Sequence, residues 1–158
     1  MKTLCGALLW SLFLLFALIL HGKEEKKRLR EYKALSHLIA HIKSSLLQAP
    51  LPLSSIFADF SDDALKGGKF LTLLREEGLP SALQSGVLSL EDEELAPFLS
   101  YAEGLGKRLY SEELLAADAL IAKSSEIAFQ KEAALPARHK LTGTLFFSGG
   151  MLVLLLLL

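Results

Sequence analysis

The chain has 158 residues, of which 51% are hydrophobic, and its formal net charge at pH 7 is −1. A charge balance of this kind argues against nucleic-acid binding, which needs a basic surface. The single cysteine, Cys5, excludes a disulfide framework.

Two long apolar runs flank a charged middle segment. The first, Leu4–Leu20, exceeds the roughly 7–15 residues of a signal-peptide core and is not followed by a cleavage site of small residues. The second, Leu141–Leu158, would span roughly 27 Å as a helix, close to the roughly 30 Å hydrocarbon core of a bilayer. Either run alone could be a buried core helix, and the first a secretion signal. We predict instead that each is a transmembrane helix.

The middle segment, residues 21–140, holds every charged residue except Lys2. Its length, about 120 residues, suffices for one compact domain and hardly for two. Lys and Arg are concentrated beside both apolar runs, within Lys23–Lys33 and at Arg138 and Lys140. By the positive-inside rule, we expect this domain in the cytosol and both ends of the chain on the far side of a cell membrane.

Helical periodicity dominates the middle segment. From Lys23 to Gln48 the apolar residues recur at spacings of three and four, which predicts an amphipathic helix continuous with the first apolar run. The turn Pro50-Leu51-Pro52 ends this helix. No stretch shows strand alternation with hairpin turns, so we predict an all-α bundle. The expected buried stripe consists of Leu29, Tyr32, Leu35, Ile39, Ile42 and Leu46.

Shorter helices are predicted from Ser54 onwards, followed by a last long one. Their boundaries are indicated by capping side chains, by glycines and by prolines. The first short helix, Ser54–Phe60, is expected to turn Ile56, Phe57 and Phe60 inward. The expected boundary signals are N-caps at Ser61 or Asp62, at Ser89 and at Ser111, a break at Gly67-Gly68, a stop at Gly78, and a kink or restart at Pro97.

Two patterns were weighed as sites of chemistry. Lys66-Gly67-Gly68-Lys69 resembles part of a phosphate loop, but Asp63 and Phe70 stand where that motif needs glycine and Ser or Thr, which favours a helix-breaking turn. His37 and His41 have the i, i+4 spacing of metal ligands, but no third ligand accompanies them and they lie off the apolar stripe. We interpret them as solvated histidines, and we expect no enzyme activity, no cofactor and no metal.

Three groups of residues are candidate contacts. An acidic run could bind a basic partner, or it could complement the positive end of a helix. A basic pair after Leu105-Gly106 could bind this run or a partner. Small residues in the first half of the second apolar run indicate a face that packs against another membrane helix. These groups are Glu91, Asp92, Glu93 and Glu94; Lys107 and Arg108; and Gly143, Ser148, Gly149 and Gly150.

Several short motifs also follow one another in a characteristic order. Gly6 lies near the start, and a basic helix opening, KKRLREYKALSHLIAHI, leads to Pro50-Leu51-Pro52. The stretch LSLEDEELAPFLSYAEGLGKRLYSEE has Leu105-Gly106 at its core, and Lys140, Gly143, Leu145 and Gly149 open the last apolar run. In this order and layout, the chain resembles the stage III sporulation protein AB family.

The resemblance implies a component of the apparatus that connects mother cell and forespore. The soluble domain of that family is similar to the cytoplasmic domain of inner-membrane platform proteins of type II secretion and type IV pili. Such platforms are not enzymes. They couple a cytosolic secretion-type ring ATPase to other membrane subunits of the same complex. The resemblance also implies a place in the mother-cell (outer forespore) membrane.

Two other interpretations remain open from the sequence. One is a general envelope scaffold that acts outside sporulation. The other is a small membrane-bound, metal-dependent enzyme built on His37 and His41.

Overall fold

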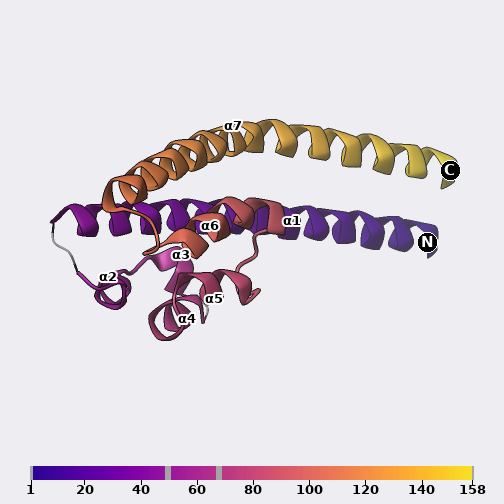
Figure 1. Cartoon of the computed structure of the whole chain (residues 1–158). Coiled ribbons are helices and arrows are strands. Elements are labelled where there is room, and N and C mark those ends of the chain that lie inside the picture. Colours follow the sequence, from indigo (N-terminus) through magenta and orange to yellow (C-terminus); the bar gives the residue numbers. More distant parts are fainter. Residues whose placement is uncertain (1, 49–50, 67–68, 158) are drawn as a thin grey trace. The chain divides into compact units, whose positions relative to one another are not determined.

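The computed structural model of the chain describes the backbone of residues 2–48, 51–66 and 69–157, and the side chains of residues 20, 22–48, 51–66 and 69–135. The described backbone contains helices and no strand (Figure 1), so the all-α prediction is confirmed. The helices are α1 (Lys2–Gln48), α2 (Leu53–Asp59), α3 (Asp63–Lys66), α4 (Phe70–Glu76), α5 (Leu79–Gln84), α6 (Asp92–Gly104) and α7 (Tyr110–Leu157).

The chain divides into two compact units. One is Lys27–Phe129, called the helical domain below, and the other combines Met1–Lys26 with Gln130–Leu158. The second unit contains the predicted spans Leu4–Leu20 and Leu141–Leu158, whose side chains, Leu20 excepted, lie outside the described residues. The predicted packing residues Gly143, Ser148, Gly149 and Gly150 lie there too. Among the residues whose side chains are described, no helix is long and apolar enough to cross a membrane.

The apolar stripe predicted on α1 is buried in the helical domain. Leu29, Tyr32, Leu35, Ile39 and Ile42 are all 9% exposed or less, whereas Leu46 at the end of the stripe is half-buried. Ala34 and Leu38 are buried as well, Leu38 completely. The buried face of α1 is therefore wider than one stripe, which indicates that more than one neighbour covers this helix.

Residues of α6 and α7 contact the buried face of α1. The ring of Tyr32 meets that of Phe98 on α6 edge to face, with centroids 5.3 Å apart. The hydroxyl oxygens of Ser36 and Ser124, on α1 and α7, are 2.8 Å apart and hydrogen-bonded. Further along the same pair of helices, Lys43 Nζ donates to Asp118 Oδ1 at 2.5 Å. The part of α1 within the helical domain is thus its central helix.

The short helices α2–α5 complete the core. α4 packs against α2, α3 and α5, and α5 packs against α6 (Figure 1). Ile56, Phe57 and Phe60 are buried as predicted. The other buried apolar side chains of these helices are Leu65, Phe70, Leu71, Leu74, Leu79, Ala82 and Leu83.

Several predicted helix boundaries are confirmed. Asp62 Oδ1 accepts the Ala64 N–H at 2.9 Å and so caps α3. α3 ends at Lys66 and α4 begins at Phe70, and the break predicted at Gly67-Gly68 lies outside the described residues. α4 ends at Glu76, and the N–H of Gly78 (φ +89°) donates to the Leu73 carbonyl at 3.2 Å. Glycine is favoured here because side chains disfavour this left-handed conformation.

The predicted cap at Ser89 is wrong. α6 begins at Asp92, and the Glu91 N–H donates to Glu94 Oε2 at 3.0 Å, which is one half of a capping box. Ser89 contacts Glu31 of α1 instead. Its N–H donates to Glu31 Oε2 at 2.7 Å and its hydroxyl to Oε1 at 3.5 Å.

The predicted cap at Ser111 is also wrong. α7 begins at Tyr110, one residue before the predicted cap Ser111, and the Leu109 N–H donates to Glu112 Oε2 at 3.3 Å. α6 continues through Pro97 as one helix, so the predicted restart does not occur there, and a kink at Pro97 stays a prediction.

Candidate functional site

The acidic run lies at the start of α6, and its members differ in their roles. Glu91 is exposed and forms an ion pair with Arg28 of α1. Glu94 is half-buried and accepts the Glu91 N–H. Asp92 and Glu93 are exposed and form no ion pair with any residue that the structure describes. Only these two carboxylates of the run are therefore available to another molecule without breaking a contact.

The basic pair is likewise divided. Lys107 is exposed, whereas 29% of the Arg108 side chain is exposed. The Arg108 guanidinium lies 3.6 Å from Glu113 Oε1 and 5.7 Å from the ring centroid of Tyr101, and it donates to the Ser100 carbonyl at 3.5 Å. The Arg108 side chain therefore makes its contacts within the helical domain.

The acidic run and the basic pair lie at opposite ends of α6. This helix has 13 residues, and a helix of that length extends roughly 20 Å. The sequence left open whether the two groups pair with each other, and their separation excludes this. As partner contacts, all six residues remain predictions, with Asp92, Glu93 and Lys107 the exposed ones without an internal ion pair in the described structure.

A buried polar cluster lies beside the C-terminal end of α6, formed by Tyr101, Arg108 and Glu113. Tyr101 and Glu113 are 4% and 5% exposed. The Tyr101 hydroxyl, Arg108 Nη1 and both Glu113 carboxylate oxygens are buried without a hydrogen-bond partner among the described residues. Burial, and then the negative charge of Glu113, raise the pKa of the Tyr101 hydroxyl. Charge attraction between Arg108 and Glu113 is therefore the main compensation for burying this cluster.

The sequence analysis missed this cluster, although a signal was present. Tyr101 follows the apolar residue Phe98 by three positions, and Glu113 precedes the apolar residue Ala117 by four. Both spacings place a polar side chain on a buried helix face.

The cluster predicts a gain of stability in Tyr101→Phe. Removing a buried hydroxyl that has no hydrogen-bond partner in the described part of the chain should raise the free energy of unfolding by about 1 kcal/mol at pH 7. Because the folded pKa of Tyr101 is raised, the unfolded chain loses its proton first as the pH rises above about 10, and stability falls there. The variant should lack this part of the alkaline loss.

Urea unfolding of the full chain in mild detergent, at pH 7 and above pH 10, measures both effects. Tyr110→Phe is the matched control, because Tyr110 is 55% exposed and its hydroxyl donates to the Leu46 carbonyl at 3.1 Å. The control should lose about 0.5–1 kcal/mol. A loss of stability in Tyr101→Phe at pH 7 would show that the hydroxyl is satisfied.

The two histidines differ from one another. His37 is exposed, with Nδ1 3.5 Å from Asp62 Oδ2, which fits the predicted solvated side chain. His41 is half-buried, its Nε2 lies 3.2 Å from the Ile56 carbonyl oxygen, and its ring packs on Phe60. The solvated interpretation is therefore wrong for His41. Among the described residues, no group of three or more His, Cys, Asp or Glu side chains is arranged to hold a metal ion.

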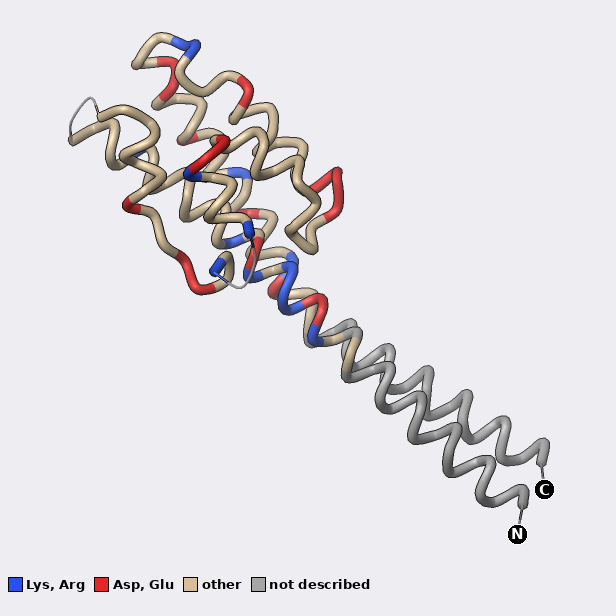
Figure 2. Tube along the Cα trace, turned by 90° about the horizontal axis from the view of Figure 1, so that it is seen from below, with Lys and Arg blue, Asp and Glu red and all other residues tan. Residues whose placement is uncertain are grey.

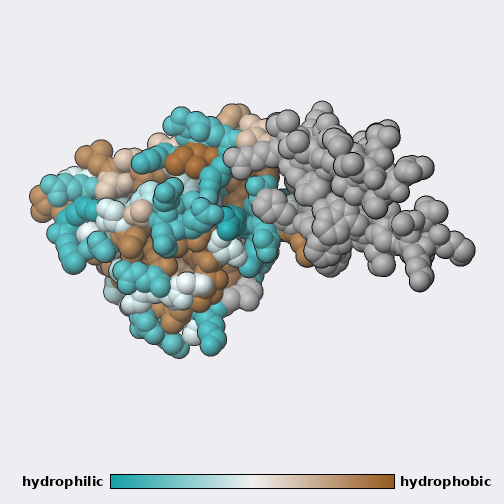
Figure 3. Space-filling model, turned by 90° about the vertical axis from the view of Figure 1, so that its right-hand side faces the viewer, coloured by the Kyte–Doolittle hydropathy of each residue, from teal (hydrophilic) through white to brown (hydrophobic). Residues whose placement is uncertain are grey.

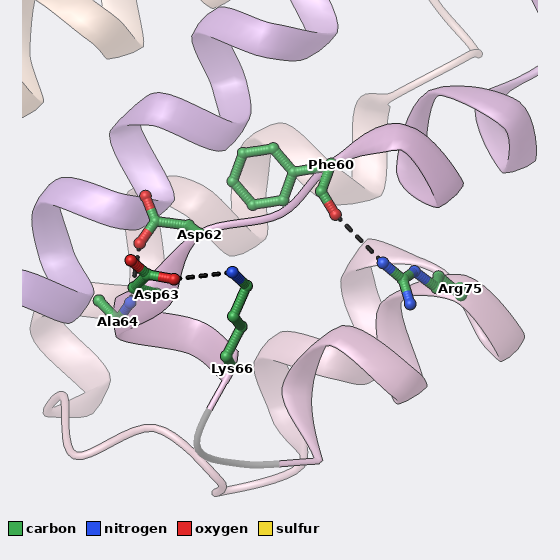
Figure 4. A network of polar contacts seen from close by, with 6 residues as sticks. All are labelled: Phe60, Asp62, Asp63, Ala64, Lys66 and Arg75. Carbon is green, nitrogen blue, oxygen red and sulfur yellow. Dashed lines mark hydrogen bonds and ion pairs between the residues drawn. The ribbon is translucent and has the colours of Figure 1, made fainter.

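The lysine before the glycine pair has a local partner (Figure 4). Lys66 Nζ donates to Asp63 Oδ1 at 2.7 Å, and this hydrogen bond, together with the lysine charge, holds the pKa of the Asp63 carboxyl below its ordinary value. Nearby, Arg75 Nη2 donates to the Phe60 carbonyl at 3.3 Å. The first contact lies within α3, and the second joins α4 to the residue that follows α2, so these charged side chains stabilise local structure.

A comparison with protein-family models, with curated proteins and with solved structures finds no significant match to this chain. The likeness to stage III sporulation protein AB therefore stays a prediction, which rests on the quoted motifs. Function has to be argued from the helical domain and its exposed charges.

Proposed function

We propose that the chain is a non-catalytic membrane platform of the sporulation channel between mother cell and forespore, and that it docks a cytosolic ring ATPase of the secretion type. In this proposal, Leu4–Leu20 and Leu141–Leu158 span the mother-cell membrane and the helical domain lies in the cytosol. Other membrane subunits of the complex pack against Gly143, Ser148, Gly149 and Gly150.

The observation that carries the docking proposal is the presentation of Asp92 and Glu93. Both are exposed, while the residues on either side are held, Glu91 by Arg28 and Glu94 by the Glu91 N–H. The two carboxylates therefore stand on a helix start whose position is fixed from both sides. Charges held in this way attract a basic partner surface and select its orientation.

The distribution of basic residues supports the orientation in the membrane. Lys and Arg gather in residues 23–33 of α1 (blue in Figure 2), whereas Asp and Glu are spread over the helical domain. A concentration of Lys and Arg beside an apolar run favours the cytosolic side.

The docking proposal predicts the effect of a double charge reversal, Asp92→Lys with Glu93→Lys. Recovery of the ring ATPase with the tagged chain, after cross-linking and detergent extraction of cells early in engulfment, should fall about tenfold, since each 1.4 kcal/mol of lost attraction is a factor of ten. Glu76→Lys with Glu77→Lys is the matched control, because both residues are exposed and lie at the end of α4. The control should recover the ATPase at the wild-type level.

Two other outcomes of this experiment would contradict the proposal. Equal recovery with both double variants would show that Asp92 and Glu93 are only a solvated helix start. Recovery of no ATPase with the wild-type chain, together with equal production in vegetative cells, would overturn the sporulation platform and favour a general envelope scaffold. Thermal melting followed by circular dichroism checks that both double variants remain folded.

A further inference from the structure

Within the helical domain, α7 has a second apolar face opposite its buried one. The buried face consists of Glu113, Ala117, Leu120, Ser124 and Ala128. Five positions on the opposite side of the helix, roughly 180° around it, are all exposed. We call them the outer seam: Leu115, Ala119, Ala122, Glu126 and Phe129.

The outer seam has the spacing of a coiled coil. Its residues follow one another at intervals of four, three, four and three, which is the alternation of a and d positions. Leu115 and Phe129 at its ends are 69% and 73% exposed. The alanines between them, Ala119 and Ala122, would let a second helix approach closely. Other large apolar side chains outside the seam are exposed as well. Figure 3 shows apolar residues (brown) among hydrophilic ones (teal) on one face of the molecule.

The charges beside the seam indicate what covers it. With Leu115 at d, Asp118 takes a g position and Lys123 the e position five residues later. In a parallel pair of identical helices, g of one helix lies beside the following e of the other, so Asp118 of each copy would meet Lys123 of its partner copy. An antiparallel pair places g beside g and loses both attractions. Asp118 also binds Lys43 of its own chain, but its side chain is 54% exposed.

We propose that the helical domain associates with a second copy of this chain through the outer seam, as a parallel, in-register pair of α7 helices. Glu126 occupies an a position and would face its counterpart in the pair, which weakens the association and fixes its register. This inference concerns self-association and does not depend on the identity of the docking partner proposed above.

Cysteine cross-linking of the full chain in mild detergent tests the pairing. In a Cys5→Ser background, Ala119→Cys and Ala122→Cys should each give a disulfide-linked dimer on mild oxidation, because parallel in-register helices bring identical positions together. Ala96→Cys is the control, since Ala96 is an exposed alanine of α6. The dimer yield at each seam position should exceed that of the control about tenfold.

Variants of the seam and of the charged residues beside it then test whether the cross-linked dimer comes from a specific helix pair or from random collisions. Adding Lys123→Asp to Ala122→Cys should reduce the dimer yield about tenfold, and adding Asp118→Lys as well should restore it. Glu126→Leu should raise the yield. All the substituted seam and flank residues are exposed, and melting curves check that the fold is kept.

Three results would overturn the proposal. The first is a dimer yield at Ala119→Cys and Ala122→Cys no higher than at Ala96→Cys. The second is cross-linking at only one of the two seam positions, which indicates a different orientation. The third is a yield unaffected by Lys123→Asp. Cross-linking of the seam to another protein in cells, with a monomer after purification, would assign the surface to that other partner.

Discussion

Arg108→Ala should lower the free energy of unfolding by about 3 kcal/mol, because it leaves a buried carboxylate without its counter-charge. Glu113 is 5% exposed, and its carboxylate oxygens have no hydrogen-bond partner among the described residues. The guanidinium of Arg108, 3.6 Å away, is the charge that compensates its burial. The variant also loses the packing of Arg108 on the ring of Tyr101.

Lys107→Ala is the matched control for this prediction. It removes the same charge from the neighbouring residue, but Lys107 is exposed, and its loss should change stability by about 0.5 kcal/mol or less. Urea unfolding of the full chain in mild detergent measures both. Adding Glu113→Gln to Arg108→Ala should recover part of the loss, since the unpaired buried charge is then gone. Equal effects of Arg108→Ala and Lys107→Ala would contradict a structural role for Arg108.

Leu38→Ala should lower the free energy of unfolding by about 2–5 kcal/mol, because it opens a cavity in a filled core. Leu38 lies on α1 and is 0% exposed. The same substitution at Leu47, also on α1 but 56% exposed, leaves no cavity and should cost about 0.5 kcal/mol or less.

Thermal and urea unfolding of the two variants, followed by circular dichroism, give the comparison. Both substitutions exchange leucine for alanine on one helix, so differences in helix propensity largely cancel. Similar losses for Leu38→Ala and Leu47→Ala would contradict the burial of α1 between the other helices of the domain.

The sequence predicted well those features that depend on local pattern. The apolar period of α1 identified Leu29, Tyr32, Leu35, Ile39 and Ile42 as buried, and Asp62 and Gly78 marked real helix boundaries. Each of these rests on neighbours along the chain, through helix periodicity, side-chain capping or glycine geometry. Such signals can be identified without knowing the tertiary structure.

Features that depend on distant partners were missed. Ser89 was assigned to a helix start, but the carboxylate that binds it belongs to Glu31, 58 residues earlier in the chain. His41 was assigned to solvent, but Phe60 and the Ile56 carbonyl adjoin it. Local sequence cannot indicate these contacts, because the neighbours are brought together only when α1 becomes the central helix.

The candidate contact residues stay predictions, but the structure separates exposed charges from internal ones. The charges of Asp92, Glu93 and Lys107 can be read from the sequence, and the structure shows that these residues are exposed. The sequence did not separate them from Arg108, whose neighbours Tyr101 and Glu113 are fixed by the meeting of α6 with the start of α7. Separating a partner contact from an internal one therefore required the folded arrangement.

In the proposed function, this helical domain is held on the cytosolic side of a membrane by apolar helices at both ends. Maleimide labelling of a single cysteine, Ala96→Cys in a Cys5→Ser background, tests it most directly. We predict that a membrane-impermeant maleimide labels the protein only after the cells are permeabilised, and that the protein stays in the membrane pellet after alkaline carbonate extraction. Labelling in intact cells, or release of the protein by carbonate, would contradict the claim.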